Sequence, residues 1–171
     1  MTVEDLLPLW PSSLWKVLDE GHRFDIGALD DCEYHGISLG QPGWVSRLTW
    51  VKFKKVFLRD PESGALRGWN VRCEQTPLDE PWTDRRRGDV RMTWGHYGVY
   101  EDQQGVTIDY GWQARGLNPQ RLVKDPLRAV NAGNADLLIG VSRVDLGLCL
   151  VGTPTYFALI RGGPLQYSVK P

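Results

Sequence analysis

Histidine is the side chain best suited to proton transfer near neutral pH, and the chain has three histidines among its 171 residues. His96 lies in the segment 92–100, where alternation places it on the same face as Met92 and Trp94. If this face points into a core, its surroundings would tune the pKa of the imidazole for acid or base catalysis. The alternative is a core histidine that is hydrogen-bonded to a carbonyl or to Tyr110.

A tyrosine and a second tryptophan could complete this site. Tyr110 and Trp112 lie on the apolar face of the segment 106–113. A short turn would pair this segment with the preceding one, and side chains on one face of two paired strands come within reach of each other. We therefore predict a cluster that contains Trp94, His96, Tyr110 and Trp112, with His96 and Tyr110 as catalytic acid and base. An aromatic core without a ligand is the alternative.

Further residues could bind a ligand, because small-molecule sites combine aromatic walls with a few polar groups. Arg72 and Arg143 lie on predicted strands, and one of them could point inward and bind a carboxylate through two parallel hydrogen bonds. His35 shares a strand face with Glu33, which could orient the imidazole or form a surface pair with it. The predicted ligand-binding residues are Trp69, Trp94, Trp112, Arg72, Arg143 and His35.

The sequence offers little support for metal or cofactor chemistry. Cys32, Cys73 and Cys149 are dispersed, and no Cys or His spacing is typical of a zinc site. Nothing resembles a nucleophile elbow, a phosphate-binding loop or a dinucleotide fingerprint. We expect no metal, no cofactor and three free thiols in a reducing cytosol.

Composition narrows the possible partners. A formal net charge of −1 argues against a nucleic-acid partner. We therefore interpret the run 85–87 of three arginines as a solvated loop tip, with an anion site as the alternative. No apolar stretch reaches the roughly 18 residues of a membrane span, and the first residues do not resemble a signal peptide. We therefore expect a cytoplasmic protein that binds neither membranes nor nucleic acid. Its oligomeric state stays open.

Eight tryptophans, 19 glycines and 11 prolines are typical of a β-rich protein with many turns. The pattern of capping, proline and apolar residues in the first 21 positions predicts short helices that lie over one end of the sheet or barrel. The connection 114–134 is long enough to act as a lid, with one helical turn at 125–130. Period-two alternation predicts strands at 32–39, 50–59, 66–75, 90–100, 106–113, 135–146 and 155–161, with a further candidate at 148–151.

These elements lack the strand–helix alternation of a parallel sheet. An antiparallel sheet of this size usually closes or stacks, because closure removes exposed edges. We therefore predict a mainly β, single-domain chain (1–171) with a helical segment at 1–21 and a barrel at 29–165. The barrel is antiparallel and up-and-down, with about eight strands, which leaves room for one small ligand. A two-sheet sandwich is the alternative.

One stretch supports the barrel by resemblance. Residues 34–42, Tyr-His-Gly-Ile-Ser-Leu-Gly-Gln-Pro, form a glycine-spaced strand that ends in a turn, and 50–57 suits a second strand. This pattern resembles the calycin barrels, which include lipocalins and nitrobindin-like proteins. The resemblance implies a cavity for a small, mostly apolar molecule. Nitrobindin-like proteins bind haem through a histidine in the C-terminal part of the barrel, and this chain has no histidine after His96, so haem is not implied.

We predict that the protein is a small-molecule-binding barrel that holds a mostly apolar or aromatic ligand in an aromatic-lined cavity. The alternative is a cofactor-independent cyclase, isomerase, lyase or decarboxylase that uses His96 and Tyr110 in the same cavity. Such an enzyme needs shape and a proton donor or acceptor, so it leaves no sequence motif. A scaffold with a filled core is a third possibility.

Overall fold

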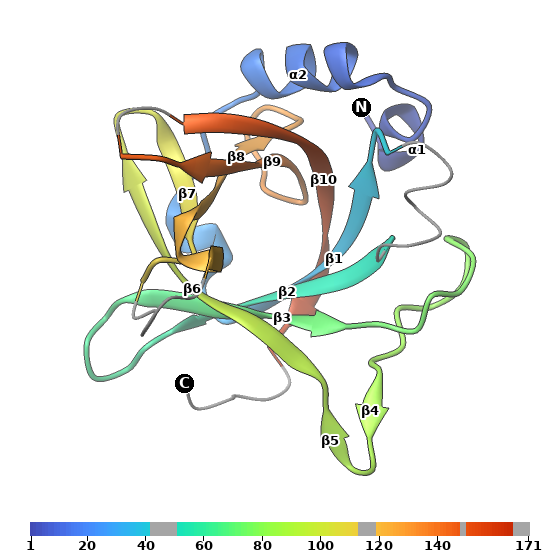
Figure 1. Ribbon diagram of the computed structural model, residues 1–171, viewed down its shortest axis with the longest axis vertical. Coiled ribbons are helices and arrows are strands. Elements are labelled where there is room, and N and C mark those ends of the chain that lie inside the picture. Colours follow the sequence, from blue (N-terminus) through green and yellow to red (C-terminus); the bar gives the residue numbers. More distant parts are fainter. Residues whose placement is uncertain (42–50, 113–118, 148–149, 166–171) are drawn as a thin grey trace.

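The computed structural model describes residues 1–41, 51–112, 119–147 and 150–165 (Figure 1). In this part of the chain, the main architecture is a closed barrel of eight strands. The barrel strands are β1 (Cys32–Leu39), β2 (Lys52–Arg59), β3 (Leu66–Arg72), β6 (Thr93–Asp102), β7 (Gly105–Asp109), β8 (Val123–Ala129), β9 (Leu137–Asp145) and β10 (Leu150–Pro164). A separate two-stranded hairpin consists of β4 (Arg86–Arg87) and β5 (Val90–Arg91).

The barrel has up-and-down topology. Apart from the inserted β4–β5 hairpin, each strand pairs antiparallel with its neighbour in the sequence, and β1 closes the ring by pairing with β10. The predicted antiparallel barrel is thereby confirmed, and the sandwich alternative is not formed. A closed barrel of this kind is compatible with the calycin-like architecture that residues 34–42 resemble.

The prediction that 114–134 is a connection without strands is wrong at 123–129. After a short 3-10 helix, η2 (Pro119–Leu122), the chain forms strand β8 instead of a helical turn at 125–130. Pro126 lies inside this strand, opposite Thr107 of β7, and the apolar side chains of Leu127 and Ala129 are buried in the barrel. Proline usually excludes a position from a central strand, which explains the error. Residues 113–118 lie outside the described residues.

Several other strand predictions need adjustment. The strand expected at 66–75 ends at Arg72, the one expected at 90–100 is divided between β5 and β6, and the one expected at 106–113 ends at Asp109. Residues 150–151 and the strand expected at 155–161 are parts of one long strand, β10, whose register shifts between Gly152 and Tyr156, while residues 148 and 149 lie outside the described residues. The strand expected at 50–59 begins at Lys52, and Trp50 lies outside the described residues, as do Cys149 and Gln113. Strand β1 has the predicted bounds.

Two short helices, α1 (Val3–Leu6) and α2 (Pro11–Asp19), precede the barrel. Leu14 and Leu18 of α2 belong to one buried cluster with Ile37 of β1 and Ile139 of β9. These strand residues lie on the outer face of the barrel, so the helices cover its wall rather than one end, as Figure 1 shows for α2. The prediction that the helices lie over one end of the barrel is therefore wrong. The outer faces of β1, β9 and β10 are apolar, so the helices pack against them instead. No helix in the described ranges is long and apolar enough to cross a membrane.

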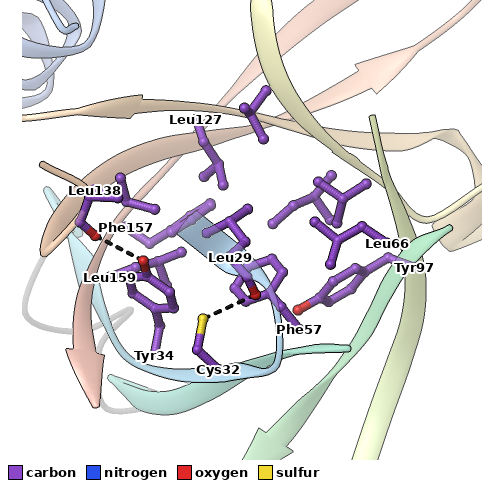
Figure 2. Close-up of a cluster of buried hydrophobic side chains, with 14 of the residues drawn as sticks. Leu29, Cys32, Tyr34, Phe57, Leu66, Tyr97, Leu127, Leu138, Phe157 and Leu159 are labelled. Carbon is purple, nitrogen blue, oxygen red and sulfur yellow. Dashed lines mark hydrogen bonds between the residues drawn. The ribbon is translucent and has the colours of Figure 1, made fainter. Parts of the chain in front are cut away.

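One end of the interior is filled by side chains. The 3-10 helix η1 (Ile26–Leu29) places Leu29 among apolar residues of the barrel strands (Figure 2). Cys32 Sγ donates a hydrogen bond to the Leu29 carbonyl at 3.1 Å, and Tyr34 Oη donates to the Ala135 carbonyl at 2.9 Å. These contacts anchor the helix and the β8–β9 loop to this end.

Interior glycines allow aromatic rings to lie across the barrel. A Cβ atom on Gly36 would lie 2.3 Å from the Phe53 ring, and one on Gly140 would lie 2.5 Å from the Phe157 ring. The two rings contact each other edge to face, with centroids 6.1 Å apart. They form part of the boundary between the filled end and the space described next.

Candidate functional site

A cavity of about 270 Å³ occupies the barrel interior beyond these rings. Its volume is just below the range of about 300–1,000 Å³ that is common for ligand pockets. Its wall combines four aromatic rings with one cation, one carboxylate and several neutral polar groups. The lining residues are Phe53, Trp94, Tyr110, Phe157, Lys55, Asp125, Asn70, Ser38, Gln41, Ser142 and Thr155.

Lys55 and Asp125 form an ion pair across the interior. Lys55 lies on β2 and Asp125 on β8, and these strands are opposite each other in the ring, with β1, β10 and β9 between them on one side and β3, β6 and β7 on the other. Lys55 Nζ is 3.3 Å from Asp125 Oδ2, and both side chains are only 2% exposed. An ion pair that is buried this deeply is held by its partners rather than by water.

The ammonium group of Lys55 has a full set of acceptors. Besides Asp125, its Nζ donates to Tyr110 Oη at 2.6 Å and to Asn70 Oδ1 at 3.1 Å. Asn70 Nδ2 in turn donates to Tyr110 Oη at 3.2 Å. Because an ammonium has three N–H donors, these three acceptors account for all of them.

Aromatic rings surround the same nitrogen. Lys55 Nζ is 5.1 Å from the ring centroids of Tyr97 and Tyr110 and 5.2 Å from that of Phe157. Ring faces attract a cation at these distances, and the attraction is stronger where water is excluded. The aromatic wall therefore favours a positive charge at a point where burial opposes it.

Burial shifts the pKa values of the pair toward each other. Loss of water lowers the pKa of Lys55, an effect that Asp125 opposes. The same loss raises the pKa of Asp125, against the effects of Lys55, Ser142 and Tyr110. Burial also raises the pKa of Tyr110 well above its usual value, so this hydroxyl keeps its proton. A proton therefore moves between Lys55 and Asp125 more easily than between the same groups in water.

The second carboxylate oxygen, Asp125 Oδ1, is buried and accepts no hydrogen bond of good geometry from the described residues. A buried acceptor without a partner is unfavourable by about 1–3 kcal/mol. Since Asp125 lines the cavity, a hydroxyl group of a bound molecule could satisfy this oxygen.

Two of the sequence-predicted residues, Trp94 and Tyr110, line the cavity, but His96 does not join them. The pairing of β3 with β6 shifts by one residue between Gly68 and Asn70, opposite Gly95, whose φ is +56°. Such a β-bulge reverses which residues face inward. His96 is therefore exposed, with its ring centroid 6.2 Å from that of Trp69, and Tyr97 takes the inward position against Tyr110.

The other two predicted tryptophans also lie away from the cavity. Trp69 is fully buried on the outer face of β3, in a small cluster with Val56 and Val71. Trp112 follows the end of β7 and packs against Gly98, where a Cβ atom would lie 2.4 Å from the indole. The expected four-residue cluster is therefore reduced to Trp94 and Tyr110.

The predicted arginines and His35 lie at three separate places. Arg143 is on the outer wall, with its guanidinium 5.2 Å from the Trp15 ring of α2. Arg72 lines a different, shallow hollow beside the β4–β5 hairpin. His35 stacks on Trp82 with centroids 4.9 Å apart. The expected Glu33–His35 pair is replaced by an ion pair between Glu33 and Lys54, with a distance of 2.9 Å.

Three residues at the centre of the cavity were not predicted from the sequence: Lys55, Asn70 and Asp125. Lys55 alternates with Phe53 and Phe57, so it is a charged residue between two aromatic residues on one face of its strand. This signal was available in the sequence. Asp125 had no comparable signal, because it directly precedes Pro126 in a segment that was interpreted as a helix start.

In the ranges that the structure describes, no group of three or more His, Cys, Asp or Glu residues is placed to hold a metal ion. Cys32 and Cys73 are free and buried. In comparisons with known proteins, no model of a protein family matches the chain, and no curated protein and no solved structure matches it. Function must therefore be argued from the cavity itself.

Proposed function

We propose that the protein binds a small, mostly apolar molecule inside the barrel, with one oxygen-containing group of that molecule at Asp125. The observation that carries this proposal is the aromatic-lined cavity whose wall contains the buried Asp125 Oδ1, which accepts no hydrogen bond of good geometry from the described residues. Ligand pockets generally have this composition, in which apolar walls supply affinity and a few placed polar groups supply orientation.

The size and the wall of the cavity suggest the class of ligand. A volume of about 270 Å³ suits one or two fused rings better than a long acyl chain. Phe53, Trp94 and Phe157 offer flat apolar surfaces, on which an aromatic or alicyclic ring would bury its faces.

The hydrogen-bonding pattern suggests where the polar group binds. Lys55 already uses its three donors within the protein, and Asn70 donates to Tyr110 and to the carbonyls of Trp94 and Gly95. Asp125 Oδ1 is a buried acceptor beside the cavity that accepts no hydrogen bond of good geometry from the described residues. An alcohol is therefore the simplest ligand that satisfies the site, because its hydroxyl donates to this oxygen.

Binding of 2-naphthylmethanol, measured by isothermal titration calorimetry, tests this proposal. We expect one site per chain, and we expect Asp125→Asn to weaken binding by roughly 10- to 100-fold, since a hydrogen bond to a charged group contributes about 1.5–3 kcal/mol. Asp79→Asn removes an exposed carboxylate and is the matched control, for which we expect unchanged affinity.

A cavity-filling variant locates the site. Ser142→Phe places a ring in the cavity and should abolish binding, while the protein keeps its barrel as judged by circular dichroism. Binding that Ser142→Phe leaves unchanged would contradict a site inside the barrel. Native mass spectrometry of protein purified without denaturation would then show whether a cellular molecule is retained.

A further inference from the structure

Lys55 differs from the two other lysines of its strand in what surrounds its amine. Lys52 Nζ donates to the backbone carbonyls of Pro77 and Glu80 at 2.9 and 2.8 Å. Lys54 Nζ forms ion pairs on the outer wall. Among the lysines in the described part of the chain, Lys55 is the one that lines the cavity, so a bound molecule could reach its nitrogen.

A lysine attacks a carbonyl carbon only as the neutral amine, which has a free electron pair. Asp125 Oδ2, at 3.3 Å, is placed to take the extra proton of the ammonium. Burial supports this transfer, because it lowers the pKa of Lys55 and raises that of Asp125. Desolvation in an apolar pocket is a general way in which proteins make a lysine nucleophilic.

We propose that Lys55 forms an imine with an aldehyde or ketone that is bound in the cavity. This inference rests on the proposed binding function and names carbonyl compounds as the ligand class. The protonated carboxyl of Asp125 would donate its Oδ2 hydrogen to the carbonyl oxygen, whereas Oδ1 of the same carboxyl group would accept a hydrogen bond from an alcohol. The site thus binds either kind of oxygen through one residue.

The condensation is balanced without any further reactant. The amine nitrogen attacks the carbonyl carbon and forms a C–N bond, and one N–H proton moves to the oxygen to give a carbinolamine. Asp125 then protonates the hydroxyl group, the C–O bond breaks, and water leaves. Loss of the second N–H proton to Asp125 yields the neutral imine. One C=O bond is replaced by one C=N bond, with release of one water and no change in oxidation state.

The surroundings of the nitrogen favour the imine over its hydrolysis. Lys55 is 2% exposed, and the rings of Tyr97, Tyr110 and Phe157 lie about 5 Å from Nζ, so a ligand that fills the cavity would exclude water from the nitrogen. Tyr110 Oη and Asn70 Oδ1 hold the nitrogen at the cavity wall, with distances of 2.6 and 3.1 Å.

Reductive trapping tests the inference on the intact protein. The protein is incubated with 2-naphthaldehyde and sodium cyanoborohydride, which reduces an imine to a stable secondary amine. We expect one adduct per chain, with the mass of the aldehyde less one oxygen, and peptide mapping should place it on Lys55. An adduct spread over exposed lysines such as Lys16, with none on Lys55, would overturn the inference.

Two comparisons separate this inference from the binding function. Lys55→Arg keeps a cation but removes the nucleophile, so it should lose the adduct, whereas Lys16→Arg should keep it. If Lys55→Arg does not fold, the peptide map of the unmodified sequence decides alone. Saturable binding of 2-naphthylmethanol without a trapped adduct would overturn the imine and leave the binding function standing. Failure of both the alcohol and the aldehyde to bind would overturn both.

Discussion

The ion pair inside the barrel makes a sharp prediction about stability. Lys55→Met removes the cation and its hydrogen bonds to Tyr110, Asn70 and Asp125, which leaves Asp125 buried without a counter-charge. Breaking a buried pair by removing one partner usually lowers the free energy of unfolding by about 3–5 kcal/mol. With both side chains 2% exposed, we expect a loss in that range near pH 8, measured by urea unfolding followed by tryptophan fluorescence.

The loss of stability in Lys55→Met should depend on pH, and the titration of the Asp125 carboxyl group determines whether the loss grows or shrinks as pH falls. Burial raises the folded-state pKa of Asp125, and removing Lys55 takes away the effect that opposes this rise. An acid with a raised folded-state pKa binds more protons in the folded state. Its contribution to stability is therefore present below the unfolded pKa of about 3.9 and is lost as pH rises toward the folded pKa. Lys55→Met should thus recover part of its stability when pH falls from about 8 to about 5.

Two variants control this experiment. Lys16→Met removes an exposed lysine paired with Glu20 and should change stability by less than about 1 kcal/mol at either pH. The double variant Lys55→Met/Asp125→Leu replaces the pair by apolar groups and should be more stable than Lys55→Met alone. A loss of less than about 1 kcal/mol for Lys55→Met, or one that is equal at both pH values, would refute the reasoning.

Three smaller predictions test the packing of the barrel. Gly36→Ala places a Cβ atom 2.3 Å from the Phe53 ring and should lower stability by about 1–3 kcal/mol, measured by urea unfolding. It should also weaken binding of 2-naphthylmethanol, measured by calorimetry. Tyr97→Phe loses a 3.0 Å hydrogen bond to a β2 carbonyl and should lower stability by about 1 kcal/mol; an unchanged unfolding midpoint would argue against that bond. Burial raises the pKa of Cys32 to about 11 and that of Cys73 to about 12. Iodoacetamide at about pH 8 should therefore label both thiols slowly in the folded protein and rapidly in urea, as followed by peptide mass spectrometry.

The barrel was predictable because inward-facing and outward-facing side chains alternate along its strands. Residues 32–39 alternate between an inner and an outer face, and the structure has a strand with these bounds. The pairing of sequential strands follows from the short turns between them. Alternation alone does not say where the helices lie, since the outer faces of β1 and β9 are apolar through Ile37 and Ile139 and attract α2 to the wall.

His96 shows how one extra residue in a strand makes a prediction from alternation wrong. The strict period of two puts His96 on the same face as Trp94 and Tyr110, and the sequence contains nothing else that decides the matter. In the structure Gly95 adopts a φ of +56°, its region of the strand contains one extra residue, and every side chain beyond it changes face. A glycine permits this conformation but does not require it, so the bulge was not predictable from residue types.

Lys55 and Asp125 were not predictable as a pair, because the contact between them depends on closure of the whole barrel. They are 70 residues apart and lie on opposite strands of the ring, so no local pattern connects them. A barrel of this size can fill its interior with apolar side chains, and apolar residues of similar volume would often be at least as stabilising as a buried ion pair. This chain instead places opposite charges at the centre and leaves open space beside them. Violations of local rules are expected at functional sites, which supports the proposal that the cavity is the binding site.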